Sequence, residues 1–290
     1  MMREFVITTE SNSDLPAAYL QENNIGVIPH YYSVEEEVYG ADRELTIKEF
    51  YQAMRDAKKV GTMASNPAVI EEVFTAYAKE GKDVLHISFS AALSCGCSNV
   101  EMVAREVMEE YPEMKIIVVD TASVSLGEGM MIARAVEMRA EGKSIEETVE
   151  EIKKLLPHIC VQFTVDDLNH LYRGGRLSKT TAVLGSIVNI KPILYINEEG
   201  KLVALDKVRG RQQSIKKLVE NMKDRIGSWR DKQIFVGIVH GDCEDEAMKL
   251  SELVKAELGD VKQVVVPIGP SIGAHSGPGA LGLLFLGETK

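Results

Sequence analysis

The sequence lacks any apolar stretch close to the roughly 20 residues that a membrane-spanning helix requires. Arg3 and Glu4 interrupt its start and no long apolar segment follows, so we expect no secretory signal peptide. Cysteine is scarce, and the four residues are Cys95, Cys97, Cys160 and Cys243. Their spacing matches neither a disulfide framework nor a zinc site. We therefore expect a cytoplasmic protein with reduced thiols and no bound metal.

Basic residues are too few and too scattered for a nucleic-acid-binding protein. Lys and Arg number 33 against 44 Asp and Glu, which gives a formal net charge of −11, and no long basic run occurs. Because contacts to phosphates need clustered Lys and Arg, we expect no nucleic acid partner. The sequence also lacks a Gly-x-Gly-x-x-Gly segment after a strand and a Walker loop, so no nucleotide fingerprint is present and no cofactor is expected.

The chain does contain aliphatic bulk and a regular alternation of predicted elements in its first half. With 290 residues, 45% of them hydrophobic, it can form one large or two ordinary domains. Predicted strands are residues 5–9, 26–30, 84–88 and 115–120. Predicted helices are 16–23, capped by Asp14, then 46–57, 67–79, 98–110, 129–140 and 144–156, with a small hairpin within 31–44. This alternation predicts an α/β domain with a largely parallel sheet flanked by helices.

The second half mixes helices with hairpin-linked strands. Predicted strands are 159–164, 191–196, 202–208, 233–240, 261–267 and a last one ending near 287. Predicted helices are 165–172, 180–188, 213–226 and 242–258. This pattern indicates a second α/β domain with a mixed sheet. We place the domains at residues 1–157 and 158–290, with a ligand cleft between them.

Two loops of the first half have the composition of anion-binding sites. The loop 90–98 leads from a strand end to a helix start, where free N–H groups and the helix dipole favour an anion, and Ser94 adds a hydroxyl. The loop 61–67, which carries Thr62, also enters a helix. Loops at the carboxyl ends of parallel strands share one edge, where ligands bind. The alternative is that both loops are ordinary helix starts, with Ser98 as the N-cap of the second.

A segment dense in glycine and proline lies near the C-terminus. Residues 269–282 hold five glycines, two prolines and His275 between two predicted strands. We interpret it as a binding loop that directs His275 into the cleft, and the alternative is a tight connection with an incidental histidine. The turn 173–176, Arg-Gly-Gly-Arg, is either a helix C-cap with neighbouring cations or a device that points Arg176 into the cleft.

Two enzymatic or regulatory functions remain as alternatives. Ser94, His275 and Asp120 are the residue types of a hydrolase triad, which suggests a serine-dependent lipid hydrolase or acyltransferase. However, the frame around Ser94 is Ala-Leu-Ser-Cys-Gly and not the Gly-x-Ser-x-Gly of a nucleophile elbow. The other alternative is a regulatory protein that senses a small acid.

Motifs spread over nearly the whole chain carry a family resemblance. They are residues 7–16, 62–67, 88–98, 118–120, 125–129, 167–176, 191–194 and 273–279. Together they make the chain similar to the DegV family, the bacterial fatty-acid-binding proteins that serve as lipid-presenting subunits of fatty acid kinase. The chain departs from the family pattern in three places. Glu10 is found where the family usually has Asp, and Cys95-Gly96 where it usually has Gly-Thr. Met63 replaces a serine that is common after Thr62.

The resemblance implies a function and a site. A long-chain fatty acid would lie between the two domains, and an ATP-dependent kinase subunit would phosphorylate its carboxylate, while this chain would not be an enzyme itself. The implied binding residues are Thr62, Ser94, Gly96, Arg176, His275 and Ser276. The departures from the family pattern bear on the hydrogen bonds to the carboxylate and not on the fold.

Overall fold

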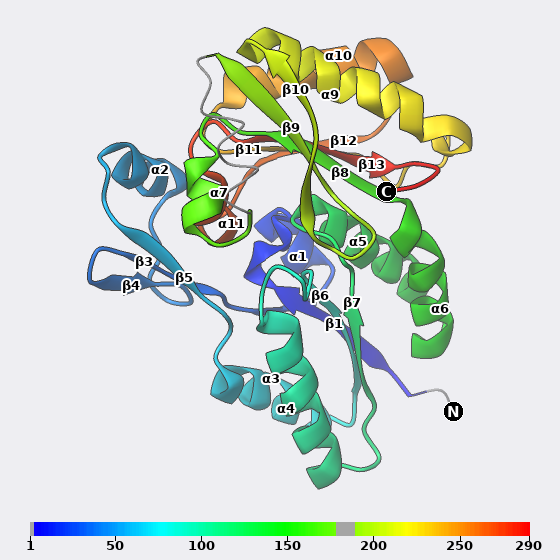
Figure 1. Ribbon diagram of the computed structural model, residues 1–290. Coiled ribbons are helices and arrows are strands. Elements are labelled where there is room, and N and C mark those ends of the chain that lie inside the picture. Colours follow the sequence, from blue (N-terminus) through cyan, green and yellow to red (C-terminus); the bar gives the residue numbers. More distant parts are fainter. Residues whose placement is uncertain (1–2, 178–188) are drawn as a thin grey trace.

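The computed structural model describes residues 3–177 and 189–290, so the helix predicted at 180–188 lies outside the described residues. Within these ranges, two main sheets and a small third one are connected by helices (Figure 1). The predicted α/β class is confirmed. No helix in the described part of the chain is long and apolar enough to cross a membrane.

The first main sheet has four parallel strands in the order β2-β1-β6-β7. They are β1 (Phe5–Glu10), β2 (Ile25–Ile28), β6 (Asp83–Ser88) and β7 (Ile116–Asp120). β6 is buried along its whole length, as expected for an inner strand of a sheet covered on both faces. Because all four strands are parallel, the loops that follow them meet at one edge of the sheet.

Helices cover both faces of this sheet (Figure 1). They are α1 (Ala17–Glu22), α3 (Pro67–Lys79), α4 (Gly96–Glu110), α5 (Leu126–Ala140) and α6 (Ile145–Leu155). α3 and α4 share one apolar core on one face, and α5 and α6 belong to the core on the other. α6 opens with the predicted capping box of Ser144 and Glu147. α4 begins at Gly96, so Ser98 is not its N-cap.

The second main sheet has six strands of mixed direction in the order β10-β9-β8-β13-β11-β12. They are β8 (Ile159–Thr164), β9 (Ile190–Ile196), β10 (Leu202–Arg209), β11 (Val236–His240), β12 (Gln263–Pro267) and β13 (Leu281–Leu286). β11 and β12 pair in parallel, and β9 and β10 form the predicted antiparallel hairpin. The predicted mixed sheet is therefore confirmed.

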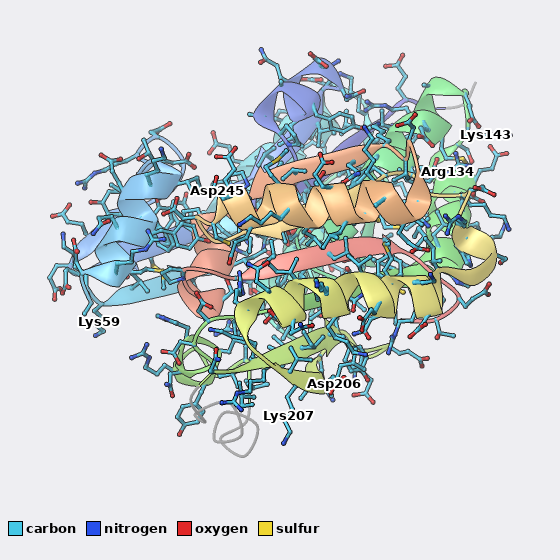
Figure 2. The ribbon with its side chains drawn as sticks, turned by 90° about the horizontal axis from the view of Figure 1, so that it is seen from above. Lys59, Arg134, Lys143, Asp206, Lys207 and Asp245 are labelled. Atoms are coloured by element: carbon cyan, nitrogen blue, oxygen red, sulfur yellow. The ribbon has the colours of Figure 1, made fainter. Side chains whose placement is uncertain are left out.

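Two long helices, α9 (Arg211–Ile226) and α10 (Glu244–Leu258), lie side by side over the outer face of this sheet (Figures 1 and 2). α9 turns an apolar stripe toward the strands, formed by Ile215, Leu218, Met222 and Ile226. This spacing is that of a helix with one buried face. On α10, the exposed Asp245 points away from the sheet (Figure 2).

α5 lies between the two main sheets and contributes to the packing of both. Ten of its 15 residues are buried. It contacts β1 and β6 on one side, and β8, β11 and β13 on the other. It begins at Leu126, three residues before the predicted start at residue 129. The division between residues 157 and 158 falls in η2 (Leu156–His158), and it stays a prediction because α5 contacts both sheets.

A small antiparallel sheet, in the order β4-β3-β5, stands beside the main sheets (Figure 1). Its strands are β3 (Tyr31–Val34), β4 (Glu37–Tyr39) and β5 (Val60–Met63), and α2 (Ile47–Arg55) packs on it. The hairpin predicted within 31–44 is confirmed. The loop predicted at 61–67 is wrong in its first part, because Thr62 is a strand residue paired with Tyr32.

The segment 269–282 contains a helix, α11 (Pro270–Ser276), where we expected an irregular loop. Pro270 occupies the first helical position, which suits its fixed φ, and Gly277 follows the helix with φ 78°. α11 packs against α2. The second half also contains the short helices α7 (Asn169–Arg173) and η3 (Gly227–Trp229), and the first half contains the short helix η1 (Ser11–Ser13).

We expect Gly273→Ala to destabilise the fold by about 1–3 kcal/mol, the usual cost of overpacking a core. A Cβ atom at this position would lie 2.6 Å from the Tyr51 hydroxyl and 3.0 Å from Phe50 Cε1. Tyr51 has little room to move, because it is fully buried and its hydroxyl donates to the Ile268 carbonyl at 3.0 Å.

Urea unfolding of both single variants and the Gly273→Ala/Tyr51→Phe double variant tests this. Removing the Tyr51 hydroxyl opens space, so the double variant should lose less stability than the two single losses combined. Strictly additive losses would contradict the steric explanation.

Candidate functional site

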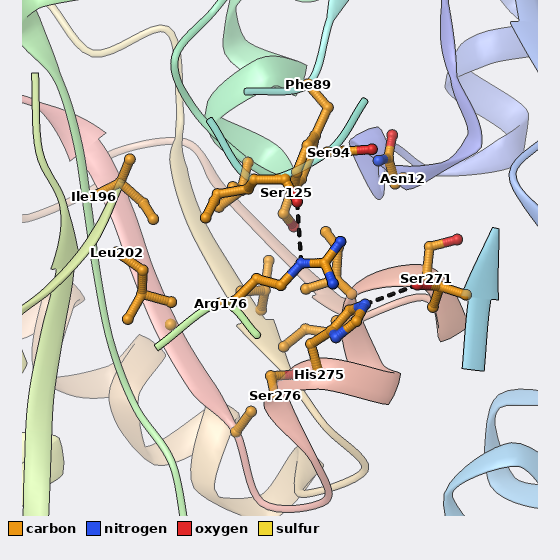
Figure 3. A pocket seen from close by; sticks show the side chains of 18 of the residues that line it. Asn12, Phe89, Ser94, Ser125, Arg176, Ile196, Leu202, Ser271, His275 and Ser276 are labelled. Atoms are coloured by element: carbon orange, nitrogen blue, oxygen red, sulfur yellow. Dashed lines mark hydrogen bonds between the residues drawn. The ribbon is translucent and has the colours of Figure 1, made fainter. Parts of the chain in front are cut away.

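A cavity of about 210 Å³ opens between the two main sheets. One wall is apolar and comes from the inner face of the six-stranded sheet. It consists of Val161, Phe163, Ile196, Leu202, Val239 and Leu284. The other end carries polar side chains, and Figure 3 shows Ser94, Asn12, His275 and Ser271 grouped away from Ile196 and Leu202. The cavity is thus amphipathic, with a polar and an apolar end.

Thr62 and His275 meet at the polar end although β5 and α11 are far apart in the chain. Thr62 Oγ1 and His275 Nε2 lie 2.8 Å apart (dashed in Figure 3). Burial, followed by the nearby Arg176 cation, lowers the pKa of His275 to about 4, so the ring is neutral at pH 7. When Nε2 carries the ring proton and donates it to Thr62, the Thr62 hydroxyl hydrogen is free for a ligand.

Arg176 lines this cavity, and Gly174 is the C-cap of α7, so the Arg-Gly-Gly-Arg turn has the features of both interpretations. Its Nε donates to the Leu93 carbonyl at 3.0 Å (dashed in Figure 3), and its Nη1 donates to the Gly174 carbonyl. Gly174 ends α7, but it has a second role. A Cβ atom there would collide with His275 Nδ1, so glycine lets the turn approach the histidine.

Ser94 lines the cavity just before α4. Its Oγ accepts a hydrogen bond from the Gly96 main-chain N–H at 3.1 Å, which leaves the hydroxyl hydrogen available to a ligand. Gly96 is buried behind Ser94 and does not line the cavity. Ser276 is a lining residue, 5% exposed, and its hydroxyl has no hydrogen-bond partner among the described residues. The structure therefore brings five of the six expected site residues to one cavity wall.

Two buried carboxyl groups, which no local sequence pattern predicts, lie behind Ser94. Glu10 and Glu128 are both fully buried. Glu10 accepts hydrogen bonds from the Ser88 hydroxyl at 2.8 Å and from the Phe89 N–H at 3.2 Å, and its Oε2 lies 3.5 Å from His86 Nε2. Burial alone would raise the pKa of Glu10, but the interactions with His86, followed by His30 and the hydrogen bond from Ser88, lower it.

Glu128, on the first turn of α5, has its pKa shifted in the opposite direction. Its Oε1 accepts a hydrogen bond from the Thr9 hydroxyl at 2.5 Å. Burial and then the negative charge of Glu10 raise the pKa of Glu128 well above its usual range, which favours the protonated carboxyl. Glu10 lies on β1 and Glu128 on α5, so no local sequence pattern predicts that the two acids lie close together.

Asp14 connects three segments around the cavity and does not cap α1, contrary to our expectation. It adopts a left-handed conformation with φ 54°, and α1 begins after Pro16 without a side-chain cap. Its carboxylate accepts hydrogen bonds from the Gly269 N–H at 2.9 Å and from the Ser125 hydroxyl. Desolvation raises the pKa of Asp14 to about 7, although these two hydrogen bonds oppose the shift.

The triad considered for a hydrolase does not form. His275 is bonded to Thr62, and the Asp120 carboxylate accepts from the main-chain N–H groups of Ala91 and Ala122 at 3.3 and 2.7 Å. Neither residue is hydrogen-bonded to Ser94, which therefore lacks the activated geometry of a nucleophile. Within residues 3–177 and 189–290, no cluster of His, Cys, Asp or Glu has the arrangement of a metal site.

Comparison with known proteins places the chain in a family. Residues 4–288 match the family model described as "Uncharacterised protein, DegV family", and the chain belongs to the DegV family. A DegV domain-containing protein of Clostridium perfringens is 38% identical over 293 residues, which cover 100% of this chain and 99% of the relative. One from Streptococcus pyogenes serotype M3 is 35% identical over 288 residues, covering 99% of both chains. The resemblance seen in the motifs is confirmed.

Solved structures share the whole fold. A DegV family protein from Thermus thermophilus, described by its fatty acid binding, is 29% identical with a TM-score of 0.87 and covers 99% of this chain and 100% of its own. DegV from Bacillus subtilis, described as a fatty acid binding protein, is 26% identical with a TM-score of 0.86 and the same coverage. The two-sheet architecture is therefore that of known DegV proteins.

We expect the stability of this protein to fall between pH 4 and pH 7 through Asp14. The folded protein keeps a proton on Asp14 up to about pH 7, whereas the unfolded chain releases it near pH 3.8. Over this window the unfolded state binds fewer protons, so rising pH favours unfolding, by up to about 4 kcal/mol at 1.36 kcal/mol per pKa unit.

Urea unfolding at pH 5 and pH 8 measures this contribution against the variant Asp14→Asn. Asparagine tolerates the left-handed conformation and keeps an acceptor for Gly269, but it does not titrate. The variant should therefore lose less stability than the wild type between the two pH values. Asp231→Asn, which removes an exposed carboxylate, is the matched control. Equal pH dependence in all three proteins would contradict a raised Asp14 pKa.

Proposed function

We propose that this protein binds a long-chain fatty acid in the cavity between its two main sheets. The observation that carries the proposal is the amphipathic cavity, in which Ser94 and Thr62 line the polar end and apolar side chains line the rest. The two similar solved structures described as fatty-acid-binding proteins support it over the full length of the chain.

The size and polarity of the cavity suit such a ligand. A water-sized group needs about 10–15 Å³ of cavity volume, so the 210 Å³ cavity holds roughly 14 to 21 such groups, comparable to the number of heavy atoms in a long-chain fatty acid. Burying ~14 methylenes at about 0.8 kcal/mol each gives roughly 11 kcal/mol of gross driving force. The ordering of ligand and side chains offsets part of it.

The carboxylate would lie at the polar end. A buried carboxylate is costly unless it accepts hydrogen bonds, and charge-assisted bonds are the strongest kind. In the proposed pose it accepts from Ser94 and Thr62, with His275 orienting Thr62 and the Arg176 cation near by. Gly96 supports Ser94 from behind, and Ser276 offers a further hydroxyl to the ligand or to a water.

The proposal includes a cytoplasmic location, the division into domains 1–157 and 158–290, and a partner. The chain itself would perform no chemistry and would present the carboxylate to an ATP-dependent kinase subunit for formation of an acyl phosphate. Support for the partner comes from the family resemblance and from the cavity rim. Cys95 and Met63 both line the polar end and are exposed, so this end lies close to solvent and within reach of another protein.

Ser94→Ala should weaken fatty acid binding by about 1.5–3 kcal/mol, the range for a hydrogen bond to a charged group, or roughly tenfold to 150-fold. Displacement of a fluorescent fatty acid measures the change. Ser98→Ala is the matched control, because Ser98 is exposed on α4 and does not line the cavity. An affinity of Ser94→Ala within twofold of the wild type would sink the assignment of Ser94.

A bound fatty acid should protect Cys95 from alkylation. Cys95 is exposed and lines the cavity, whereas burial raises the pKa of Cys97, Cys160 and Cys243 to about 12 and slows their reaction with maleimide. Saturating fatty acid should slow labelling at Cys95 at least about tenfold, and Cys95→Ser should remove the fast phase. A labelling rate that does not respond to lipid would place the ligand elsewhere.

A further inference from the structure

His30 is a buried residue of the cavity wall with an unused ring nitrogen. It follows β2, is 6% exposed and lines the cavity at its polar end. Its main-chain N–H donates to the Ser11 hydroxyl at 3.0 Å, which fixes the backbone there. Its Nε2 is buried and has no hydrogen-bond partner among the described residues. Such an atom is costly to bury unless some state of the protein gives it a partner.

Three polar side-chain atoms surround the position that a Cβ atom at residue 96 would occupy. Glu10 Oε1, His30 Nε2 and Ser94 Oγ each lie 3.4 Å from that position. No two of them can therefore be farther apart than twice this distance. Glycine at position 96 lets the three groups converge, and they come from β1, from the segment after β2 and from the loop before α4.

This convergence creates an electrostatic problem when a carboxylate binds. Glu10 is an anion in an enclosed region, and a ligand carboxylate beside Ser94 would place a second negative charge within the same region. Like charges repel strongly where water is excluded. A cation between them removes the problem, and His30 is the titratable group that lies next to both positions.

The other charged or titratable groups around this point are less suited to the role. They are Glu10 on β1, His86 on β6, Cys95 before α4, Glu128 on α5, Arg176 after α7 and His275 on α11. His86 has its Nδ1 bonded to Thr8 at 2.9 Å and does not line the cavity. His275 has its Nε2 bonded to Thr62, and the adjacent Arg176 cation disfavours a second positive charge.

We propose that His30 is a further ligand-binding residue, which takes up one proton from the solvent when a carboxylate binds beside Ser94 and then pairs, as imidazolium, with Glu10 and that carboxylate. No bond other than the new N–H bond forms in this step. The inference rests on the proposed function and extends it to specificity. His30 would favour lipids with an ionised headgroup over neutral lipids of the same length.

Neutral His30 in the empty protein agrees with this assignment. Burial lowers the pKa of His30, and the neighbouring His86 acts in the same direction, whereas Glu10 opposes them. A ligand carboxylate would add a second anion on the side of Glu10, which shifts the balance toward the charged ring. Binding and protonation of His30 would thus be linked.

Calorimetric titration with laurate, below its critical micelle concentration, at pH 7.5 in buffers of different ionisation enthalpy counts the protons taken up. We expect close to one proton per laurate in the wild type and close to none in His30→Gln. His275→Gln should bind laurate more weakly but keep the proton uptake. The matched control is His158→Gln, which replaces a histidine outside the cavity lining.

The affinities for laurate and dodecanol test the specificity directly. His30→Gln should bind laurate at least about tenfold more weakly than the wild type, and it should bind dodecanol equally well. If His30→Gln proves poorly folded, NMR of the wild type with ¹⁵N-labelled histidine gives the same information, because laurate should convert one neutral ring to imidazolium.

The outcomes separate the two proposals. If the wild type binds neither laurate nor a long-chain fatty acid, the proposed function fails. If laurate binds without proton uptake, or if the uptake persists in His30→Gln, the proton does not go to His30. This inference is then overturned while fatty acid binding stands.

Discussion

The position of the cavity depends on a single helix that two sheets share. α5 is buried over most of its surface because β1 and β6 pack on one side of it and β8, β11 and β13 on the other. The helix therefore holds the sheets apart at one end, and the space beside it is open to a ligand. The loop before α5 also carries Ser125, which bonds Asp14, so the same helix fixes the segments that form the polar end.

A buried anion, Glu10, lies behind the proposed carboxylate site, and hydrogen-bond donors and a histidine stabilise its charge. The pKa of Glu10 is lowered, and the raised pKa of Glu128 favours its uncharged form beside that anion. The longer side chain of glutamate, where the family usually has aspartate, reaches both the Ser88 hydroxyl and the Phe89 N–H. Of the three departures from the pattern of the resembled family, Glu10 thus lies behind the cavity, whereas Met63 and Cys95 line it together with Ser94 and Thr62.

The order of elements and the parallel and mixed sheets could be predicted from periodicity, because local burial patterns determine them. The capping box at Ser144 was also visible, since both partners lie within four residues. Asp14 was misread because its true partner, Gly269, is 255 residues away, and a local cap was the only pairing the sequence offered. α11 was not expected because the longer segment 269–282 is dense in glycine and proline, and the packing of the helix against Tyr51 offsets the weak helix propensity of Gly273.

For the candidate site, hydroxyl-rich loops and family motifs pointed to Thr62, Ser94 and His275, which do share one cavity. The contact between Thr62 and His275, and the group of Glu10, His30 and His86, depend on tertiary packing that no single stretch encodes.

The strand order carries a consequence for how the protein is made. β13 sits between β8 and β11, in the middle of the larger sheet, although it is synthesised after both. During translation, the first sheet can fold early, but the apolar wall of the cavity cannot close until residue 286 has been added, so a growing chain has no lipid site to offer.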